Sequence, residues 1–352
     1  MAVAADRDHH KTRADLARWL RDRTAATDVE VGELSIPGLS GFSNETLLFD
    51  ATWDGVVRPL VIRVEPTGHT VFPATAFDAQ VKVMQALGAE GTVPVPEVLW
   101  FEQDTTVLGA RFLCMARVEG DVPADSPGYH GEGWMVALDE AAQRCVWESG
   151  LDTMAAIHRL DRAAIGLDWI ADVPPAEQLE LDREYRTFAC GDVPYPVVDR
   201  AFELLEADIP AASDRPALCW GDSRIGNMIF GADHTVAAVL DWEMVTAGDP
   251  VQDLAWYLLL DRHHTMAFGV PRLPGLPERQ ESIARWETAS GHSAQHLLWY
   301  ELLGATRYAS IMVRVMKLLD SSGVFPGAAD TAFDQTGTRL LAQMLDEHDS
   351  GH

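Results

Sequence analysis

The hydrophobic pattern of this 352-residue chain changes its period near residue 117. Before that point, short runs of β-branched and aromatic residues separated by turn signals predict strands. Beyond it, most segments repeat their apolar residues at helical spacing. We therefore expect an α+β fold in which a small antiparallel sheet precedes a mainly helical part. The segments expected are an N-terminal tail and helix (1–25), a sheet-rich lobe (26–117) and a helical lobe (118–352).

The sheet-rich lobe contains one clear hairpin signal. Asp54 and Gly55 separate two strand-like runs, over 46–52 and 59–64, and an Asp-Gly pair is a strong signal for a two-residue turn. The pattern also predicts a helix over 12–23, a helix over 75–88 that stops at Gly88, and strands within VPVPEVLWFE and ARFLCMARVEG.

The helical lobe is interrupted by one short β segment, residues 217–242. Two strands, 227–230 and 235–241, flank a turn at 231–234. Proline-rich stretches at 173–175 and 193–196 predict loops, and helices are expected over 136–161, 197–208, 251–262, 278–290, 294–320 and 330–348.

Three oxygen-bearing side chains converge on this β segment. Asn227 opens one strand of the hairpin and Asp241 closes the other, so both lie at the same end, while Asp222 lies on the preceding loop. Mg²⁺ prefers hard oxygen ligands that it shares with phosphates, and phosphoryl transfer depends on positioning and charge neutralisation. This pattern predicts that Asp222 is a catalytic base and that Asn227 and Asp241 are metal ligands.

The segment around these residues resembles the catalytic core of the aminoglycoside phosphotransferase-like kinase family. That family includes aminoglycoside, choline and homoserine kinases and the kinase-like domains fused to acyl-CoA dehydrogenases, and the last branch is the most similar. The family pattern is His-Gly-Asp, four residues and Asn, then Asp-Trp-Glu and Gly-Asp-Pro. The matching residues here are Trp220-Gly221-Asp222, Asn227, Asp241-Trp242-Glu243 and Gly248-Asp249-Pro250.

The resemblance implies a protein-kinase-like two-lobed fold and transfer of the γ-phosphate of ATP or GTP to a hydroxyl of a small molecule, with Mg²⁺. It also implies a phosphate-covering loop whose backbone N–H groups approach the nucleotide, an Arg63 that pairs with phosphate, and an adenine-lining hinge over 113–118. The nucleotide-binding residues implied are Ser40, Gly41, Phe42, Ser43, Asn44, Arg63, Met115 and Arg117.

Two residues depart from the family pattern. Trp220 replaces a histidine that supports the loop, and it offers only packing and an indole N–H. Gln80 stands where kinases carry a glutamate that pairs with the strand cation, and Asp78 is an alternative partner for Arg63. Supporting roles are expected for Gln80, His158, Trp220, Arg224, Glu243 and Asp249.

Several nearby residues are expected to be structural. His158 is expected to pack near the catalytic loop and Asp253 to brace it. His263 and His264 do not face each other on a helix, and they are expected at the surface or in the substrate cleft. Trp256, Trp286 and Trp299 are candidates for the wall of an acceptor pocket.

Composition excludes some classes of protein. With 54 acidic and 27 basic residues, a formal charge of −27, the chain lacks the basic character of nucleic-acid binders. The N-terminal residues are charged and lack the apolar core of a signal peptide, and no apolar run reaches the length of a membrane span. The four cysteines form no CxxC pair. These features predict a cytoplasmic protein with reduced thiols, and they leave its oligomeric state open.

The acceptor stays open between two classes, a polycationic aminoglycoside and a hydroxylated metabolite or hydroxyacyl thioester. The rival functions are a pseudokinase scaffold, which binds nucleotide without turnover, and a plain ligand-binding protein, which shows no nucleotide-dependent response.

Overall fold

The sheet-rich lobe is built on one five-stranded antiparallel sheet. The computed structural model describes residues 7–36, 45–68, 70–74, 76–126 and 128–351. The strands follow the order β1-β2-β3-β5-β4, and the central pair β2–β3 runs without a register shift from Glu45↔Val64 to Trp53↔Val56. The elements of this lobe are α1 (His9–Thr24), β1 (Glu30–Val31), β2 (Glu45–Trp53), β3 (Val56–Val64), α2 (Phe77–Glu90), β4 (Val98–Glu102) and β5 (Phe112–Ala116).

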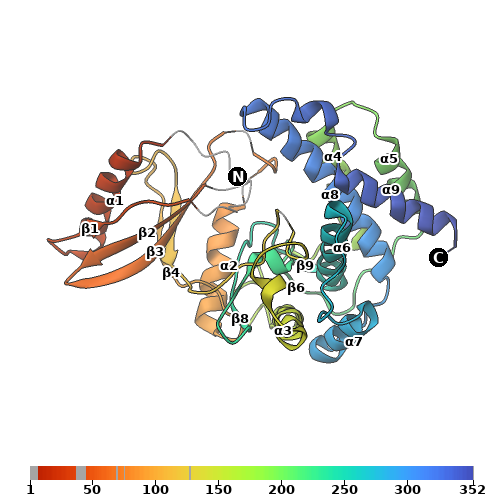
Figure 1. Cartoon of the computed structure of the whole chain (residues 1–352), viewed down its shortest axis with the longest axis horizontal. Coiled ribbons are helices and arrows are strands. Elements are labelled where there is room, and N and C mark those ends of the chain that lie inside the picture. The colour runs from red at the N-terminus through yellow and green to blue at the C-terminus, as the bar shows by residue number, and fades with distance from the viewer. Residues whose placement is uncertain (1–6, 37–44, 69, 75, 127, 352) are drawn as a thin grey trace.

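The two faces of this sheet bury different neighbours. Leu60, Ile62 and Cys114 join a core cluster with Leu16 and Trp19 of α1, whereas residues of opposite parity on the same strands belong to the main core, which extends through the helical lobe. Val61 and Met115 are examples of the second set, so the face that carries Arg63 is turned toward the helical lobe. Figure 1 shows the sheet and α1 on one side of the molecule and the later helices on the other.

The helical lobe surrounds two small β ladders. β6 pairs with β9, and β7 pairs with β8 in the predicted hairpin. Around them, α6 packs against α8, which also contacts α4, α5 and α9. The elements are η1 (Trp134–Ala137), α3 (Glu140–His158), α4 (Pro175–Cys190), α5 (Pro196–Ala207), β6 (Ala217–Cys219), η2 (Ile225–Asn227), β7 (Met228–Phe230), β8 (Val236–Val239), β9 (Thr246–Gly248), α6 (Val251–Phe268), α7 (Arg279–Ser290), α8 (Leu297–Ser321), η3 (Ala328–Thr331) and α9 (Thr336–Asp349).

The architecture confirms the expected α+β fold and most of its elements. The Asp54-Gly55 turn has positive φ at both residues, 53° and 71°, as a two-residue hairpin of this kind requires. Several predicted bounds were wrong: the helix expected over 136–161 is α3, Glu140–His158, and the one expected over 330–348 is α9, which begins at Thr336. α2 does not stop at Gly88 but continues to the left-handed cap at Gly91, α6 extends six residues beyond 262 to Phe268, and α4 begins at a proline stretch predicted as a loop. Proline suits the first turn of a helix because a backbone N–H there has no acceptor within the helix, so proline loses no hydrogen bond by lacking one.

The connection between the lobes is pinned to the catalytic hairpin. Asp121 and Phe230 exchange two backbone hydrogen bonds, each 2.9 Å long. Gly120, just before, has φ +146°, and a Cβ there would lie 2.3 Å from the carbonyl oxygen of Phe230. The chain therefore enters the helical lobe through a contact that only glycine allows.

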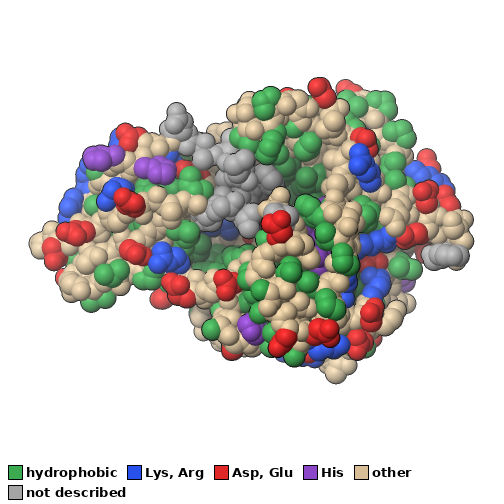
Figure 2. Space-filling model, in the orientation of Figure 1, with side chains coloured by type: hydrophobic (Ala, Val, Ile, Leu, Met, Phe, Trp, Pro, Cys, Tyr) green, Lys and Arg blue, Asp and Glu red, His purple; other side chains and the backbone are tan. Residues whose placement is uncertain are grey.

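Figure 2 shows acidic side chains scattered over both lobes on the face in view. Among the described residues, no helix combines the length and the apolarity that crossing a membrane requires.

We expect Gly120→Ala to lower the free energy of unfolding by about 2–3 kcal/mol, because the new Cβ meets backbone that cannot rotate away. Gly68→Ala is the matched control, since a Cβ at Gly68 meets nothing within 4 Å. Denaturant unfolding of both variants measures the difference, and equal stabilities would show that the entry to the helical lobe is not constrained in this way.

Candidate active site

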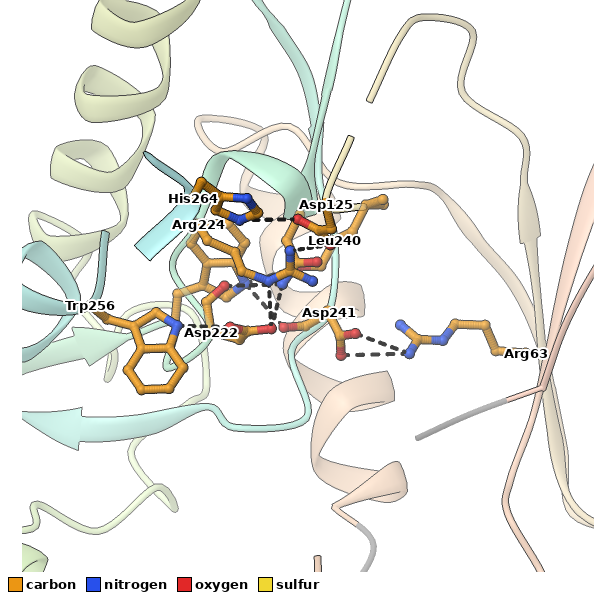
Figure 3. Close-up of polar contacts among 10 residues, drawn as sticks. Arg63, Asp125, Asp222, Arg224, Leu240, Asp241, Trp256 and His264 are labelled. Carbon is orange, nitrogen blue, oxygen red and sulfur yellow. Dashed lines mark hydrogen bonds and ion pairs between the residues drawn. The ribbon is translucent and has the colours of Figure 1, made fainter. Parts of the chain in front are cut away.

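The Asp222 carboxylate is held by three side-chain donors from two parts of the helical lobe. Its Oδ1 accepts from Nε1 of Trp256 on α6 at 2.8 Å, and its Oδ2 accepts from Nδ2 of Asn227 at 2.6 Å and Nε of Arg224 at 3.2 Å. Each carboxylate oxygen carries two lone pairs. The carboxylate can therefore accept a further hydroxyl. The three donors fix the orientation of the carboxylate, and Figure 3 shows its contacts with Trp256 and Arg224.

Asn227 and Asp241 lie at the same end of the β7–β8 hairpin. Met228 pairs with Val239, and the next bond along the ladder joins Leu240 N–H to the Asn227 carbonyl at 2.8 Å. Because Nδ2 of Asn227 donates to Asp222, its side-chain oxygen remains available as a ligand. The structure therefore brings together the three residues singled out in the sequence.

Asp241 adopts a left-handed backbone conformation with φ 58°. This conformation is costly for a residue with a side chain, and Trp220 supplies a restraint that holds it. The Trp220 indole N–H donates to the carbonyls of Leu240 at 2.8 Å and Asp241 at 3.1 Å, and its ring packs near Trp242. Trp220 therefore contributes ring packing and one indole N–H donor, as expected from the sequence.

Gly221 lets the catalytic loop cross the chain that follows the hairpin. Its φ is +91°, and a Cβ there would lie 2.1 Å from the carbonyl oxygen of Met244. Any other residue at this position displaces one of the two segments. The glycine therefore sets how closely Asp222 approaches the end of the hairpin.

A fully buried carboxylate, Asp253 of α6, holds the catalytic loop from beneath. It accepts the backbone N–H groups of Trp220 at 2.6 Å and Gly221 at 2.9 Å, and it contacts Nε2 of His158 at 3.0 Å. Nδ1 of that histidine accepts from the indole of Trp286 at 3.0 Å, so Nε2 carries the proton given to Asp253. His158 and Asp253 thus have the structural positions expected of them.

Arg63 links the sheet to the catalytic hairpin. Its Nη2 lies 3.4 and 3.5 Å from the two carboxylate oxygens of Asp241, at the long limit of a hydrogen bond. Within the described residues, Nε of Arg63 is buried without a hydrogen-bond partner. The same holds for both side-chain polar atoms of Gln80, a residue that is 1% exposed. Asp78 is bound by Arg111 at 2.8 Å, so the alternative pairing of Asp78 with Arg63 is wrong in this structure.

The nucleotide side of the site is only partly described. Ser40, Gly41, Phe42, Ser43 and Asn44 lie outside the described residues. Met115 is buried on the sheet face turned toward the helical lobe. Arg117 follows β5 and forms an ion pair with Asp50 of β2 at 3.0 Å.

Asp125, on the connection between the lobes, is a site residue that sequence reasoning missed. Its Oδ2 accepts from Nη1 of Arg224 at 2.5 Å, and its Oδ1 lies 3.6 Å from Nε2 of His264. Burial opposes the charge of Arg224, but Asp125 and Asp222 outweigh it and raise the pKa of that guanidinium. The Ala-Asp-Ser-Pro sequence around Asp125 reads as an ordinary turn, which left no signal of this contact.

The α6 face that begins at Trp256 continues along the site. His263 and His264 are buried rather than at the surface, and burial lowers the pKa of both, that of His263 to about 4. Tyr308 of α8 donates to or accepts from Nε2 of His263 at 3.0 Å. Of the three tryptophans considered as pocket walls, only Trp256 contacts Asp222, since Trp286 donates to His158 and Trp299 to the Leu205 carbonyl.

The other expected supporting residues lie after the hairpin. Glu243 is half-buried beside Trp242. Asp249 accepts the N–H of Val251 at the start of α6, and burial raises the pKa of its carboxyl group. Both belong to the frame of the site.

The residues present suit a divalent cation that is shared with a phosphate. Asn227 and Asp241 offer two hard oxygen ligands, which is too few for an all-protein site. No cluster of three or more His, Cys, Asp or Glu ligands occurs in the described ranges. Magnesium commonly binds through one or two such groups together with substrate phosphates and water.

We expect Asp253→Asn to lower the free energy of unfolding by about 2–3 kcal/mol, because the amide presents one N–H₂ group toward donors that all need an acceptor. Asp152→Asn, which alters only the surface ion pair with Arg285, is the matched control. Thermal unfolding checks this, and similar midpoints for the two variants would contradict it.

Comparison with known proteins places this geometry in a family. The model of the phosphotransferase enzyme family matches residues 35–291. Acyl-CoA dehydrogenase family member 11 of Gallus gallus is 30% identical over 258 residues, 71% of this chain and 31% of that protein. Family member 10 of Mus musculus is 31% identical over 206 residues, 57% of this chain and 18% of its own length. The chain therefore spans less than a third of these relatives.

Solved structures show the same fold. A protein of Ralstonia eutropha with a provisional aminoglycoside phosphotransferase assignment matches with a TM-score of 0.68 at 24% identity, covering 94% of this chain and 98% of that one. Macrolide 2'-phosphotransferase type I matches at 0.61 and 17% identity, covering 95% and 98%. A thermostable mutant of aminoglycoside phosphotransferase APH(4)-Ia with an aspartate-to-alanine substitution, in ternary complex with ADP and hygromycin B, matches at 0.57 and 16% identity, covering 93% and 98%. This chain belongs to the phosphotransferase enzyme family.

Proposed function

We propose that this phosphotransferase transfers the γ-phosphate of ATP or GTP to a hydroxyl group of a small molecule. The observation that carries the proposal is the meeting of Asp222, Asn227 and Asp241 at one end of the β7–β8 hairpin. The site lies where Arg63 of the sheet reaches Asp241 of the helical lobe. The nucleotide then lies against the sheet, and the acceptor lies on the side of Asp222 and α6.

In this mechanism Asp222 receives the acceptor. The hydroxyl donates to its carboxylate, and the proton passes to Asp222 as the oxygen forms a bond to the γ-phosphorus. The bond between that phosphorus and the bridging oxygen breaks, and the nucleoside diphosphate leaves. Trp256, Arg224 and Asn227 prevent the carboxylate from rotating, which preserves the alignment on which such transfers depend.

Asn227 and Asp241 are the residues that would hold Mg²⁺. When bound, the ion neutralises charge on the nucleotide phosphates. Arg63 would exchange its long contact with Asp241 for a phosphate oxygen. Its guanidinium then makes charge-assisted hydrogen bonds that are shorter and stronger than the contact it leaves.

Ser40–Asn44 would cover the phosphates, and Met115 and Arg117 would line the adenine. The acceptor class stays open at this level, between an aminoglycoside and a hydroxylated metabolite or hydroxyacyl thioester. The names of the relatives, which are acyl-CoA dehydrogenase family members, support the acyl thioester. The names of the structural neighbours, which include an aminoglycoside phosphotransferase, support the aminoglycoside.

We expect Asp222→Ala to lower kcat by about a hundredfold or more, because removal of a positioned base eliminates proton transfer in the transition state. Nucleotide binding persists, because Asp222 does not hold the nucleotide. Coupled diphosphate release across a panel of alcohols, with thermal shift by Mg-ATP and Mg-GTP, measures both quantities.

The same measurements separate the rival functions, with Asp152→Asn as the control. A thermal shift without turnover of the wild type on any alcohol would identify a nucleotide-binding scaffold. A wild type without a nucleotide-dependent shift would identify a plain ligand-binding protein.

We expect Arg63→Gln to raise the KM for nucleotide about tenfold, equivalent to about 1.4 kcal/mol, with a smaller effect on the KM for the acceptor. Arg58→Gln is the matched control on the same strand, because Arg58 stacks 3.9 Å from the Trp53 ring centroid instead. Steady-state kinetics with each substrate varied in turn checks this, and equal effects of both variants would exclude a phosphate-binding role for Arg63.

A further inference from the structure

The acceptor side of Asp222 contains an arginine with an unfilled edge. Arg224 uses Nε for Asp222 and Nη1 for Asp125. Within the part of the chain that the structure describes, its Nη2 has no hydrogen-bond partner. The Nη1–Nη2 edge of a guanidinium can bind a carboxylate or phosphate through two parallel hydrogen bonds, as Arg279 binds Glu301 in this structure, and Asp125 occupies half of that edge in Arg224.

Asp125 is an imperfect partner for this arginine. Its Oδ1 is buried and makes no hydrogen bond with the described residues, and Nε2 of His264 lies 3.6 Å away. A buried acceptor without a donor costs about 1–3 kcal/mol. The Asp125 side chain is nevertheless 35% exposed and lies on the connection between the lobes. Release of Asp125 into water would therefore satisfy Oδ1 and uncover Nη1.

The surroundings are poorly suited to a polycation. Asp222 is engaged by three donors, and the free oxygen of Asp125 is sealed from solvent. Asp261, further along α6, is bound by Tyr129, His130 and Arg272. An ammonium group placed here would meet the positive charge of Arg224, and the one acceptor position that Asp222 keeps, on Oδ1, is the position that the reacting hydroxyl would use.

We propose that the acceptor alcohol carries an oxyanion, a carboxylate or a phosphate, a short distance from its reacting hydroxyl, and that Arg224 binds this group in place of Asp125. The hydroxyl and the oxyanion lie close together in such a substrate because Nε of Arg224 is 3.2 Å from the Asp222 carboxylate. Asp125 thus acts as an internal substitute for the anion when the acceptor is absent. This inference rests on the proposed phosphoryl transfer and narrows its acceptor to anionic alcohols.

Four small alcohols that differ in charge test the proposal: glycerate, glycerol phosphate, glycerol and choline. The wild type is expected to use one of the two anions with a KM at least about tenfold below that of glycerol, a difference of about 1.4 kcal/mol. Whether glycerate or glycerol phosphate is preferred distinguishes the carboxylate from the phosphate. Equal KM values for anion and glycerol, or a preference for choline, would overturn the proposal.

Two variants locate the effect. Asp125→Asn removes the charge that competes for Arg224, and we expect it to lower the ratio of the KM for the preferred anion to the KM for glycerol several-fold. Arg224→Gln should abolish the preference for the anion. Asp152→Asn, remote from the site, should behave as the wild type. A change of equal size for all four alcohols in Asp125→Asn would indicate a purely structural role and would contradict the proposal.

A binding measurement keeps the result independent of turnover. Calorimetric titration of glycerate and glycerol phosphate into the full chain with Mg-AMP-PNP should show binding of one anion that Asp125→Asn tightens and Arg224→Gln removes. Anion binding that is absent, or identical in all three proteins, would overturn the inference even where Asp222-dependent turnover of another alcohol is found. Loss of the nucleotide response would instead overturn the proposed function.

Discussion

The buried carboxylate of Asp253 is the interaction on which the site depends. It gathers two consecutive backbone N–H groups of the catalytic loop and the imidazole of His158 into one place with no access to water. A charged group in this position is tolerated only because donors surround it. The same helix presents Trp256 to Asp222 one turn later. The orientation of α6 therefore fixes both the loop that carries Asp222 and the direction of the Asp222 carboxylate.

Around this centre, two arginines connect the helical lobe to the rest of the chain. Arg63 reaches Asp241 from the sheet, and Arg224 reaches Asp125 on the connection between the lobes. The contact of Arg63 is long, and the contact of Arg224 leaves one carboxylate oxygen of Asp125 without a hydrogen-bond partner among the described residues. The proposed substrates would replace both contacts. Nucleotide phosphate would take the place of Asp241 at Arg63, and the acceptor's anion would take the place of Asp125 at Arg224.

Local elements of the fold were predictable where a single short-range signal decided them. The Asp54-Gly55 turn and the β7–β8 hairpin are examples, because turn chemistry and alternation act over a few residues. The start of α4 at Pro175 was missed because proline serves equally as a loop residue and as the first residue of a helix. The extension of α6 to Phe268 was missed because this helix is buried on nearly all sides, which removes the periodic contrast.

The sequence by itself determined that Asp222, Asn227 and Asp241 lie close together, because they lie within twenty residues and a hairpin brings its own ends together. It also indicated the supporting roles of His158 and Asp253. Only the tertiary structure showed that Asp125, about a hundred residues before Arg224, shares its guanidinium, and that Asp78 pairs with Arg111 rather than Arg63. Such contacts depend on how separate elements pack in space, and no local pattern records which charged side chain a distant one will meet.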